Sequence, residues 1–323
     1  MNLTMREAKA ASGSAPVMKR PFIRVTEVWV PSEDGPLTLK DGLYGPLDDF
    51  ERVARETRFA KGEGLPGMAW ETGVPIVLKD LVGSYFKRGA AAELAGLTCA
   101  VAVPVFQGDT LNAVLVMFCG DDAEHVGAIE LWHAPPRDPE MALVDGYFGT
   151  ADVFEWTARH VNFVKGSGLP GQTWERGFPV VFANLASPRF LRWEKAAKVG
   201  ITRGFSLPIH SPQPGVYVLA FLSALATPIA RRVEVWVAEN GRLKLADGFC
   251  EQAGLLGAAP LDLAFGEGAI GMAATSGVPQ VTADLSAEPA AIASAARFAQ
   301  LDTLVALPVF GAGGLVAVAV WYL

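Results

Sequence analysis

The sequence has 323 residues and a formal net charge of −7; 51% of the residues are hydrophobic and 19% are charged. This acidic balance, without a long run of Lys or Arg, argues against nucleic acid as a partner. The three cysteines, Cys99, Cys119 and Cys250, form no Cys-x-x-Cys pair, which argues against a disulfide framework and favours a reducing, cytoplasmic location.

Two apolar segments, residues 205–230 and 303–323, could suggest a membrane span, and the N-terminus could suggest a signal peptide. Residues 303–323 carry no charge and are long enough to cross a bilayer, but Pro308 and three glycines interrupt them. Residues 1–20 scatter charges among Ala and Ser and lack the apolar core of a signal peptide. We therefore expect no membrane contact, and a flexible N-terminal arm over residues 1–20.

After this arm, the first expected strand carries a signature that recurs twice more. It is Glu-x-Trp, at residues 27–29, 130–132 and 234–236. Strand alternation places Glu27 and Trp29 on the same face of the first copy. A tight turn and a returning strand follow each copy, and Asn240-Gly241 in the third copy is a strong hairpin signal. Each repeat therefore opens on a β-hairpin.

A glycine motif of the form Gly-x-Gly-x-x-Gly follows each hairpin. Dinucleotide-binding loops share this spacing, but they need a full crossover helix between parallel strands. Here the next strand-like run, residues 75–78, begins too soon for that crossover, and Pro66 and Pro170 remove backbone N–H groups. We interpret these glycines as structural residues that supply positive φ at a tight strand-to-helix corner. They are Gly62, Gly64, Gly67, Gly166, Gly168, Gly171, Gly266, Gly268 and Gly271.

The segment after the glycine motif differs most between the repeats. It contains aromatic and charged residues in the first two copies, whereas the third copy has an alanine-rich helix over residues 290–299. A signature of the type Val-Pro-Val, at residues 103–105, 207–209 and 307–309, then closes each repeat on an antiparallel strand pair.

This combination resembles the GAF domain: the glycine motif, a short helix ending in Thr-Gly or Arg-Gly, and a strand of the type x-Pro-Val-Val. The resemblance covers three copies, from Phe22 to Leu323. It implies an α+β fold of three consecutive GAF-like domains, each a roughly six-stranded antiparallel sheet flanked by short helices on both faces. The expected domains are residues 21–124, 125–228 and 229–323. The long helices that usually flank a GAF domain are missing from this sequence.

The resemblance also implies a ligand cavity. The segment that follows the glycine motif and its strand would cover this cavity, and we call that segment the roof. Aromatic groups with a few charges suit an amphipathic ligand. The candidates in the first repeat are Trp70, Glu71, Tyr85, Phe86 and Arg88, and those in the second are Trp174, Glu175, Phe190, Arg192, Trp193, Arg203 and His210. Trp70 and Trp174 are favoured instead as core residues. In the third repeat Ala274 replaces the tryptophan, so we expect a degenerate pocket there.

GAF domains are mostly sensors or regulatory modules. The resemblance therefore implies a non-enzymatic regulatory protein that binds a small molecule in domain 1, domain 2 or both, with no cofactor. The alternative is a structural adaptor that binds a protein partner or forms a homo-oligomer. A weaker alternative is a thiol reductase for free methionine sulfoxide, in which Cys99 and Cys119 would have to serve, although both lie in apolar strands. The scattered histidines lack metal-ligand spacing, so we expect no metal site.

Overall fold

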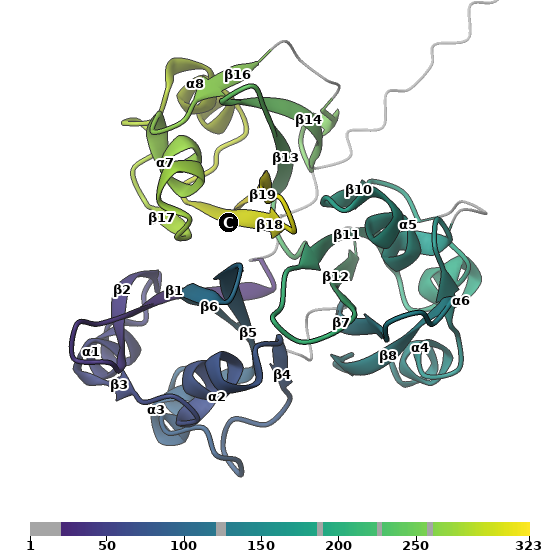
Figure 1. Cartoon of the computed structure of the whole chain (residues 1–323), viewed down its shortest axis with the longest axis horizontal. Helices are drawn as coiled ribbons and strands as arrows, with labels where there is room; N and C mark the ends of the chain where they lie inside the picture. The colour runs from purple at the N-terminus through teal and green to yellow at the C-terminus, as the bar shows by residue number, and fades with distance from the viewer. Residues whose placement is uncertain (1–20, 121–126, 186–189, 225–227, 257–260) are drawn as a thin grey trace, which may run out of the picture.

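The computed structural model describes residues 21–120, 127–185, 190–224, 228–256 and 261–323. These residues form three antiparallel sheets, one from each repeat, as the sequence predicts. We call each sheet with its helices a domain and number the domains 1 to 3 in chain order (Figure 1). The expected arm over residues 1–20 and the expected boundary between residues 124 and 125 lie outside the described residues. The domain limits stay predictions.

Domain 1 shows the arrangement that the other domains repeat. Its strands are ordered β3-β2-β1-β6-β5-β4, so that β1, with the Glu-x-Trp signature, lies near the middle of the sheet. Its elements are β1 (Ile23–Pro31), β2 (Leu37–Leu43), α1 (Asp48–Glu56), β3 (Arg58–Phe59), α2 (Gly64–Thr72), β4 (Ile76–Leu78), α3 (Gly89–Leu94), β5 (Leu97–Gln107) and β6 (Thr110–Gly120).

Domain 2 has the equivalent order β9-β8-β7-β12-β11-β10. Its elements are β7 (Gly127–Ala134), β8 (Glu140–Tyr147), α4 (Asp152–Ala158), β9 (Phe163–Val164), α5 (Gly168–Arg176), β10 (Val180–Phe182), α6 (Trp193–Lys198), β11 (Ile201–Ile209) and β12 (Val216–Ala224).

Domain 3 has the order β15-β14-β13-β19-β18-β17, and β16 also pairs with β14. Its elements are β13 (Arg232–Glu239), β14 (Arg242–Cys250), β15 (Gly254–Leu255), β16 (Asp262–Ala264), α7 (Gly268–Ser276), β17 (Gln280–Thr282), α8 (Ala290–Phe298), β18 (Leu304–Gly311) and β19 (Gly314–Tyr322).

The glycine motif forms the expected tight corner, but its three glycines are needed for two different reasons. Gly62 and Gly64 have positive φ angles of 81° and 57°, as predicted. The same prediction is wrong for Gly67, where a Cβ atom would lie 2.1 Å from the carbonyl oxygen of Ala60. Gly67 is therefore required by a close backbone approach. Because β4 pairs antiparallel with β5, domain 1 lacks the parallel crossover of a dinucleotide-binding fold.

The described helices of each domain pack on one face of its sheet. In domain 1, Phe50 of α1 and Leu65 and Ala69 of α2 share a buried cluster with Val25 and Trp29 of β1. The expectation of helices on both faces is therefore wrong. Figure 1 shows why: the helices lie on the outside of the molecule, and the other face of each sheet is turned towards the centre.

A single shared core fills this centre. It draws on the closing strand pair of every domain, and includes Val103, Leu115, Leu207, Leu219, Leu307 and Ala319. The three closing signatures meet around a cavity of about 20 Å³, which is room for one water molecule. The face of each sheet that carries no helices is thus covered by the sheets of the neighbouring domains. The longest helices in the described part of the chain have nine residues, and none there is long and apolar enough to cross a bilayer.

The three domains close into a ring. β4 lies against β7 and β8 of domain 2, β10 lies against β14 of domain 3, and β17 lies against β2 of domain 1. Polar contacts support two of these joints: the Ser211 hydroxyl donates to the carbonyl oxygen of Gly73 at 2.7 Å, and the Asn112 amide donates to that of Gly277 at 3.2 Å. An ion pair between Arg203 and Glu251 supports the joint between domains 2 and 3.

Candidate functional site

The carboxylate of the Glu-x-Trp signature is buried between sheet and roof. In domain 1, Glu27 is fully buried and accepts hydrogen bonds from the Trp29 indole at 2.9 Å and from the Tyr44 hydroxyl at 3.0 Å. The Arg88 guanidinium completes the group with two hydrogen bonds of 2.6 and 2.7 Å. Such a bidentate, charge-assisted pair is among the stronger hydrogen-bonded arrangements in proteins.

Aromatic rings enclose this ion pair. The Arg88 guanidinium lies 4.7 Å from the ring centroid of Phe50 and 5.4 to 5.5 Å from those of Phe86, Phe118 and Trp29. The position of Arg88 directly before α3 lets its side chain enter the core from the roof. Burial, followed by the charge of Glu27, raises the pKa of Tyr44 well above its ordinary value, so its hydroxyl stays a hydrogen-bond donor.

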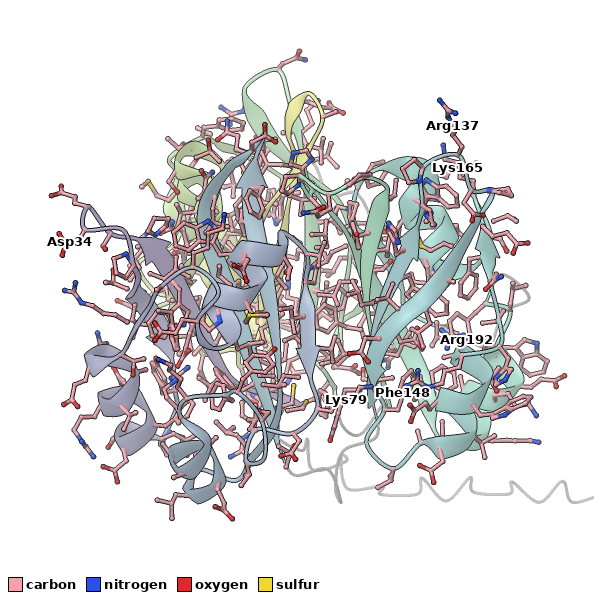
Figure 2. The ribbon with its side chains drawn as sticks, turned by 60° about the horizontal axis from the view of Figure 1, so that its bottom comes forward. Asp34, Lys79, Arg137, Phe148, Lys165 and Arg192 are labelled. Carbon is pink, nitrogen blue, oxygen red and sulfur yellow. The ribbon has the colours of Figure 1, made fainter. Side chains whose placement is uncertain are left out.

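Domain 2 repeats the arrangement with one hydrogen bond fewer. Glu130 accepts from the Trp132 indole at 3.0 Å and from Arg192 at 2.6 and 2.7 Å. Phe148 takes the place of Tyr44: its ring lies 6.3 Å from Phe154, and the Tyr44 ring lies 6.3 Å from Phe50. Figure 2 shows Arg192 within the body of domain 2, away from its upper surface.

Domain 3 keeps the carboxylate and takes its arginine from elsewhere. Glu234 accepts from the Trp236 indole at 2.9 Å and from the Tyr322 hydroxyl at 3.0 Å. Its cation is Arg232, two residues earlier on the same strand, whose Nε donates to Glu234 at 2.7 Å. The third repeat therefore lacks the roof arginine, as expected, but its buried carboxylate still has a cationic partner, Arg232.

These clusters place four of the predicted residues in the cores of domains 1 and 2. Phe86, Arg88, Phe190 and Arg192 are all buried. Their side chains occupy the space beneath the roofs, where the resemblance implied a ligand cavity. Sequence reasoning did not select the glutamates, although the signal was present: one carboxylate recurs three times on the face of the strand that carries the buried tryptophan.

The remaining predicted residues lie in four other places. Tyr85 and Trp193 are exposed on the outer side of the roofs. Trp70, Glu71, Trp174 and Glu175 lie on α2 and α5, where Lys61 and Lys165 lie over the tryptophan rings at 5.9 and 5.6 Å. Arg203 lies at the joint of domains 2 and 3, and His210 lies beside the central cavity. The structure does not gather the predicted set into one site.

The joint between domains 2 and 3 contains a narrow cavity. Its volume is about 30 Å³, which suits one or two water molecules. Arg203 and the buried Glu251 line it, with 2.7 Å between the Arg203 Nε and the Glu251 carboxylate, and the Arg203 guanidinium stacks 4.0 Å from the Phe249 ring. Burial raises the pKa of Glu251, and its bond to Arg203 acts in the opposite direction.

A larger hollow opens on the outer surface of domain 2. Its volume is about 590 Å³, within the range of small-molecule sites. One wall is the turn between β7 and β8, another is the half-buried Trp174, and Lys165 lies at the edge. A second surface hollow of about 510 Å³, lined by Gly166, Glu175 and Leu191, adjoins it at Lys165. Two predicted candidates, Trp174 and Glu175, therefore line adjoining hollows.

The cysteines and histidines form no recognisable catalytic or metal arrangement in the described part of the chain. Cys99, Cys119 and Cys250 are buried and free of disulfides. No group of three His, Cys, Asp or Glu side chains there could hold a metal ion.

Residues 28–134 match the model of the GAF domain family. No curated protein matches this chain. Among solved structures, a mutated NreA protein from Staphylococcus aureus, altered in its nitrate binding site, is 19% identical over 31% of this chain and 74% of its own, with a TM-score of 0.26. A GAF domain/HD domain protein from Geobacter sulfurreducens is 20% identical over 31% and 65%, with a TM-score of 0.27.

The reduced form of fRMsr of Staphylococcus aureus is 20% identical over 31% of this chain and 58% of its own, with a TM-score of 0.25. Each of these likenesses extends over a length close to that of one domain. They are too weak to carry a statement about ligand or activity.

Proposed function

We propose that this chain, a tandem GAF-domain protein, is a non-enzymatic regulatory protein that binds a small molecule in the outer hollow of domain 2. The family match over residues 28–134 supports a sensor or regulatory role. The hollow itself is the observation on which the proposal depends. It combines a volume of about 590 Å³ with the exposed part of an indole ring and two cationic side chains, Arg137 and Lys165.

The interior of domains 1 and 2 supports the same choice of surface. Arg88 and Arg192 are each bonded to a buried glutamate and enclosed by four aromatic rings. A ligand beneath either roof would have to displace this ion pair and leave a buried carboxylate uncompensated, which is costly. The hollow of domain 2 requires no such displacement.

A thermal-shift screen of the full chain against a metabolite library tests this proposal. A bound ligand stabilises the folded protein by mass action, so the melting temperature should rise with ligand concentration. Trp174→Ala and Lys165→Ala should remove the shift, and the matched domain 1 variant Lys61→Ala should preserve it. A library without a single saturable shift, or shifts unaffected by the domain 2 variants, would exclude a site in this hollow.

The alternative is an adaptor that acts through protein contacts, and a specific observation favours it. Each domain exposes a large apolar side chain on an outer helix: Leu94 is 91% exposed on α3, Trp156 is 63% exposed on α4, and Phe298 is 75% exposed on α8. Isolated exposed residues of this kind are common on monomers, so this is the second candidate. Light scattering of the purified chain and of a Trp156→Ser, Phe298→Ser variant would distinguish an oligomer held by these contacts from a monomer.

A further inference from the structure

The walls of the domain 2 hollow are fixed by the fold. Asp138 accepts a hydrogen bond from the Glu140 backbone N–H at 3.0 Å, and the Asp138 N–H donates to the Pro135 carbonyl oxygen at 3.1 Å. Pro136 and Pro139 restrict the same turn further. These contacts restrict the conformation of the turn beside Trp174.

Arg137 lies at the tip of this turn in a conformation that side chains rarely adopt. Its φ is 69°, in the left-handed region, which costs of order 1 kcal/mol or more for a non-glycine residue. A glycine or asparagine would adopt this angle at less cost. Arg137 therefore holds its guanidinium group at the turn in a backbone conformation that favours glycine or asparagine.

The hollow has two cations without an ion pair. The described part of the chain gives neither Arg137 nor Lys165 a carboxylate partner, although the whole chain has a net charge of −7. Lys165 instead lies over the Trp174 ring. Figure 2 shows Arg137 and Lys165 at the same end of domain 2, with Arg137 extending from the turn into solvent.

Domain 1 offers an internal comparison because it keeps the lysine and tryptophan but has an acidic residue at the turn position of the arginine. Lys61 lies 5.9 Å from the Trp70 ring centroid, as Lys165 does at 5.6 Å from that of Trp174. The turns 32–35 and 135–138 are closed by equivalent hydrogen bonds, from the Gly35 N–H to Ser32 and from the Asp138 N–H to Pro135, so Asp34 takes the place of Arg137. Asp34 pairs with Arg58 at 3.2 Å. The arginine at this turn position therefore distinguishes domain 2 from domain 1.

From these observations we propose that the hollow of domain 2 binds an anionic small molecule that carries a flat ring, of which an aromatic carboxylate is the simplest kind. The ring packs against Trp174 and the prolines of the turn, and Arg137 and Lys165 bind the negative charge. A planar guanidinium matches a carboxylate in two parallel hydrogen bonds, and the lysine adds a second positive charge. This inference rests on the proposed function and adds the chemical class of the ligand.

The test compares aromatic carboxylates with their neutral amides, for example 1-naphthoate with 1-naphthamide, in calorimetric titrations of the full chain. The carboxylate should bind saturably and at least about tenfold more tightly than the amide, because the amide lacks the negative charge that Arg137 and Lys165 bind. Arg137→Asp, which introduces the residue that domain 1 has at this turn position, and Lys165→Glu should each weaken carboxylate binding about tenfold or more. Lys61→Glu is the matched control and should leave binding unchanged.

Three other outcomes would overturn the inference, and they separate it from the proposed function. Equal binding of carboxylate and amide, with both lost in Trp174→Ala, would preserve the site and exclude an anionic ligand class. Carboxylate binding that Lys61→Glu weakens as much as Lys165→Glu would show nonspecific attraction. The absence of saturable binding by every carboxylate and amide, together with a silent thermal-shift screen, would exclude both the inference and the proposed function. Unchanged melting temperatures of the charge-reversal variants would show that these losses do not come from unfolding.

Discussion

Cys99 of β5 and Cys119 of β6 lie directly opposite each other on neighbouring antiparallel strands, and both side chains belong to the shared core. Opposite residues of such a pair have Cβ atoms about 4.5–5.5 Å apart, close to the separation of about 3.5–4.5 Å that a disulfide requires. The sequence predicts the antiparallel strand pair that carries the two cysteines, but they match no spacing motif that would identify them as a pair.

We expect the oxidant diamide to join these two cysteines at urea concentrations that begin to open the shared core, because both thiols are fully buried in the folded chain. It would take one hydrogen from each thiol as the two sulfur atoms bond. Mass spectrometry of non-reduced peptides should show a Cys99–Cys119 cross-link that Cys119→Ser abolishes and Cys250→Ser does not. Full alkylation of both thiols after diamide treatment would contradict this expectation.

The double variant Cys99→Ser, Cys119→Ser tests the thiol reductase alternative. That alternative fails if the native chain does not reduce free methionine sulfoxide, or if this variant reduces it equally well.

Removal of the cation from a buried ion pair should destabilise domain 1. Arg88→Met leaves Glu27 buried with two neutral donors, and we expect a loss of about 3–5 kcal/mol in the free energy of unfolding. The double variant Arg88→Met, Glu27→Gln should recover part of that loss because the uncompensated charge is gone. Urea unfolding followed by tryptophan fluorescence measures both. A single variant as stable as the native chain would show that the pair is not buried in solution.

The difference between Tyr44 and Phe148 predicts a reciprocal pair of substitutions. Phe148→Tyr should bring a hydroxyl to Glu130, as Tyr44 does to Glu27, and stabilise domain 2 by about 0.5–1.5 kcal/mol. Tyr44→Phe should destabilise domain 1 by at least that amount. Unfolding free energies of both variants test this pair. Destabilisation by Phe148→Tyr would show that the two roofs differ in shape as well as in sequence.

The ion pair at the joint of domains 2 and 3 predicts a pH dependence. Burial raises the pKa of Glu251 in the folded chain above its value in the unfolded chain. The stabilisation that protonated Glu251 gives the folded state is therefore complete below the pKa of the unfolded state. It is lost as the pH rises through the pKa of the folded state. Arg203→Met removes the partner that lowers this pKa and so increases the shift. The stability lost in Arg203→Met should therefore be larger near pH 7 than at about pH 4, close to the ordinary pKa of a glutamate.

Melting curves over that pH range, with Arg203→Lys as the charge-preserving control, measure this effect. The control should keep the pH dependence of the native chain at a lower stability, because lysine loses the bond to Ala183 and the stacking on Phe249. A loss of stability in Arg203→Met that is independent of pH would show that Arg203 acts through packing on Phe249 and not through its charge.

The sequence predicts the elements of each domain well because their signals are local. The glycine corner, the Asn240-Gly241 turn and the opening hairpins each depend on the conformational preferences of a few neighbouring residues. The ring of domains is different, since Val103, Leu207 and Leu307 lie in apolar strands whose partners the sequence does not specify. The sequence therefore did not predict that other domains, and not helices, cover one face of each sheet.

The buried clusters lie between these two cases. The sequence analysis selected Arg88 and Arg192 because aromatic residues lie near them in the roof, and in the structure aromatic rings do surround both guanidinium groups. Their partners were not selected, because a glutamate in a strand is ordinarily exposed. The alternation that places Glu27 beside Trp29 on a buried face is the evidence that could have identified them. A buried carboxylate in three repeats requires three cations, and Arg232 provides the third.

Closure of the ring through β17 and β2 also affects how the protein is made. A polypeptide leaves the ribosome from its N-terminus, and domains generally fold in that order. The parts of the inner faces of domains 1 and 2 that domain 3 covers therefore stay exposed until domain 3 is translated. A transcript that ends early would yield a product with Val103 and Leu207 facing water, and such a fragment should require a chaperone or be degraded.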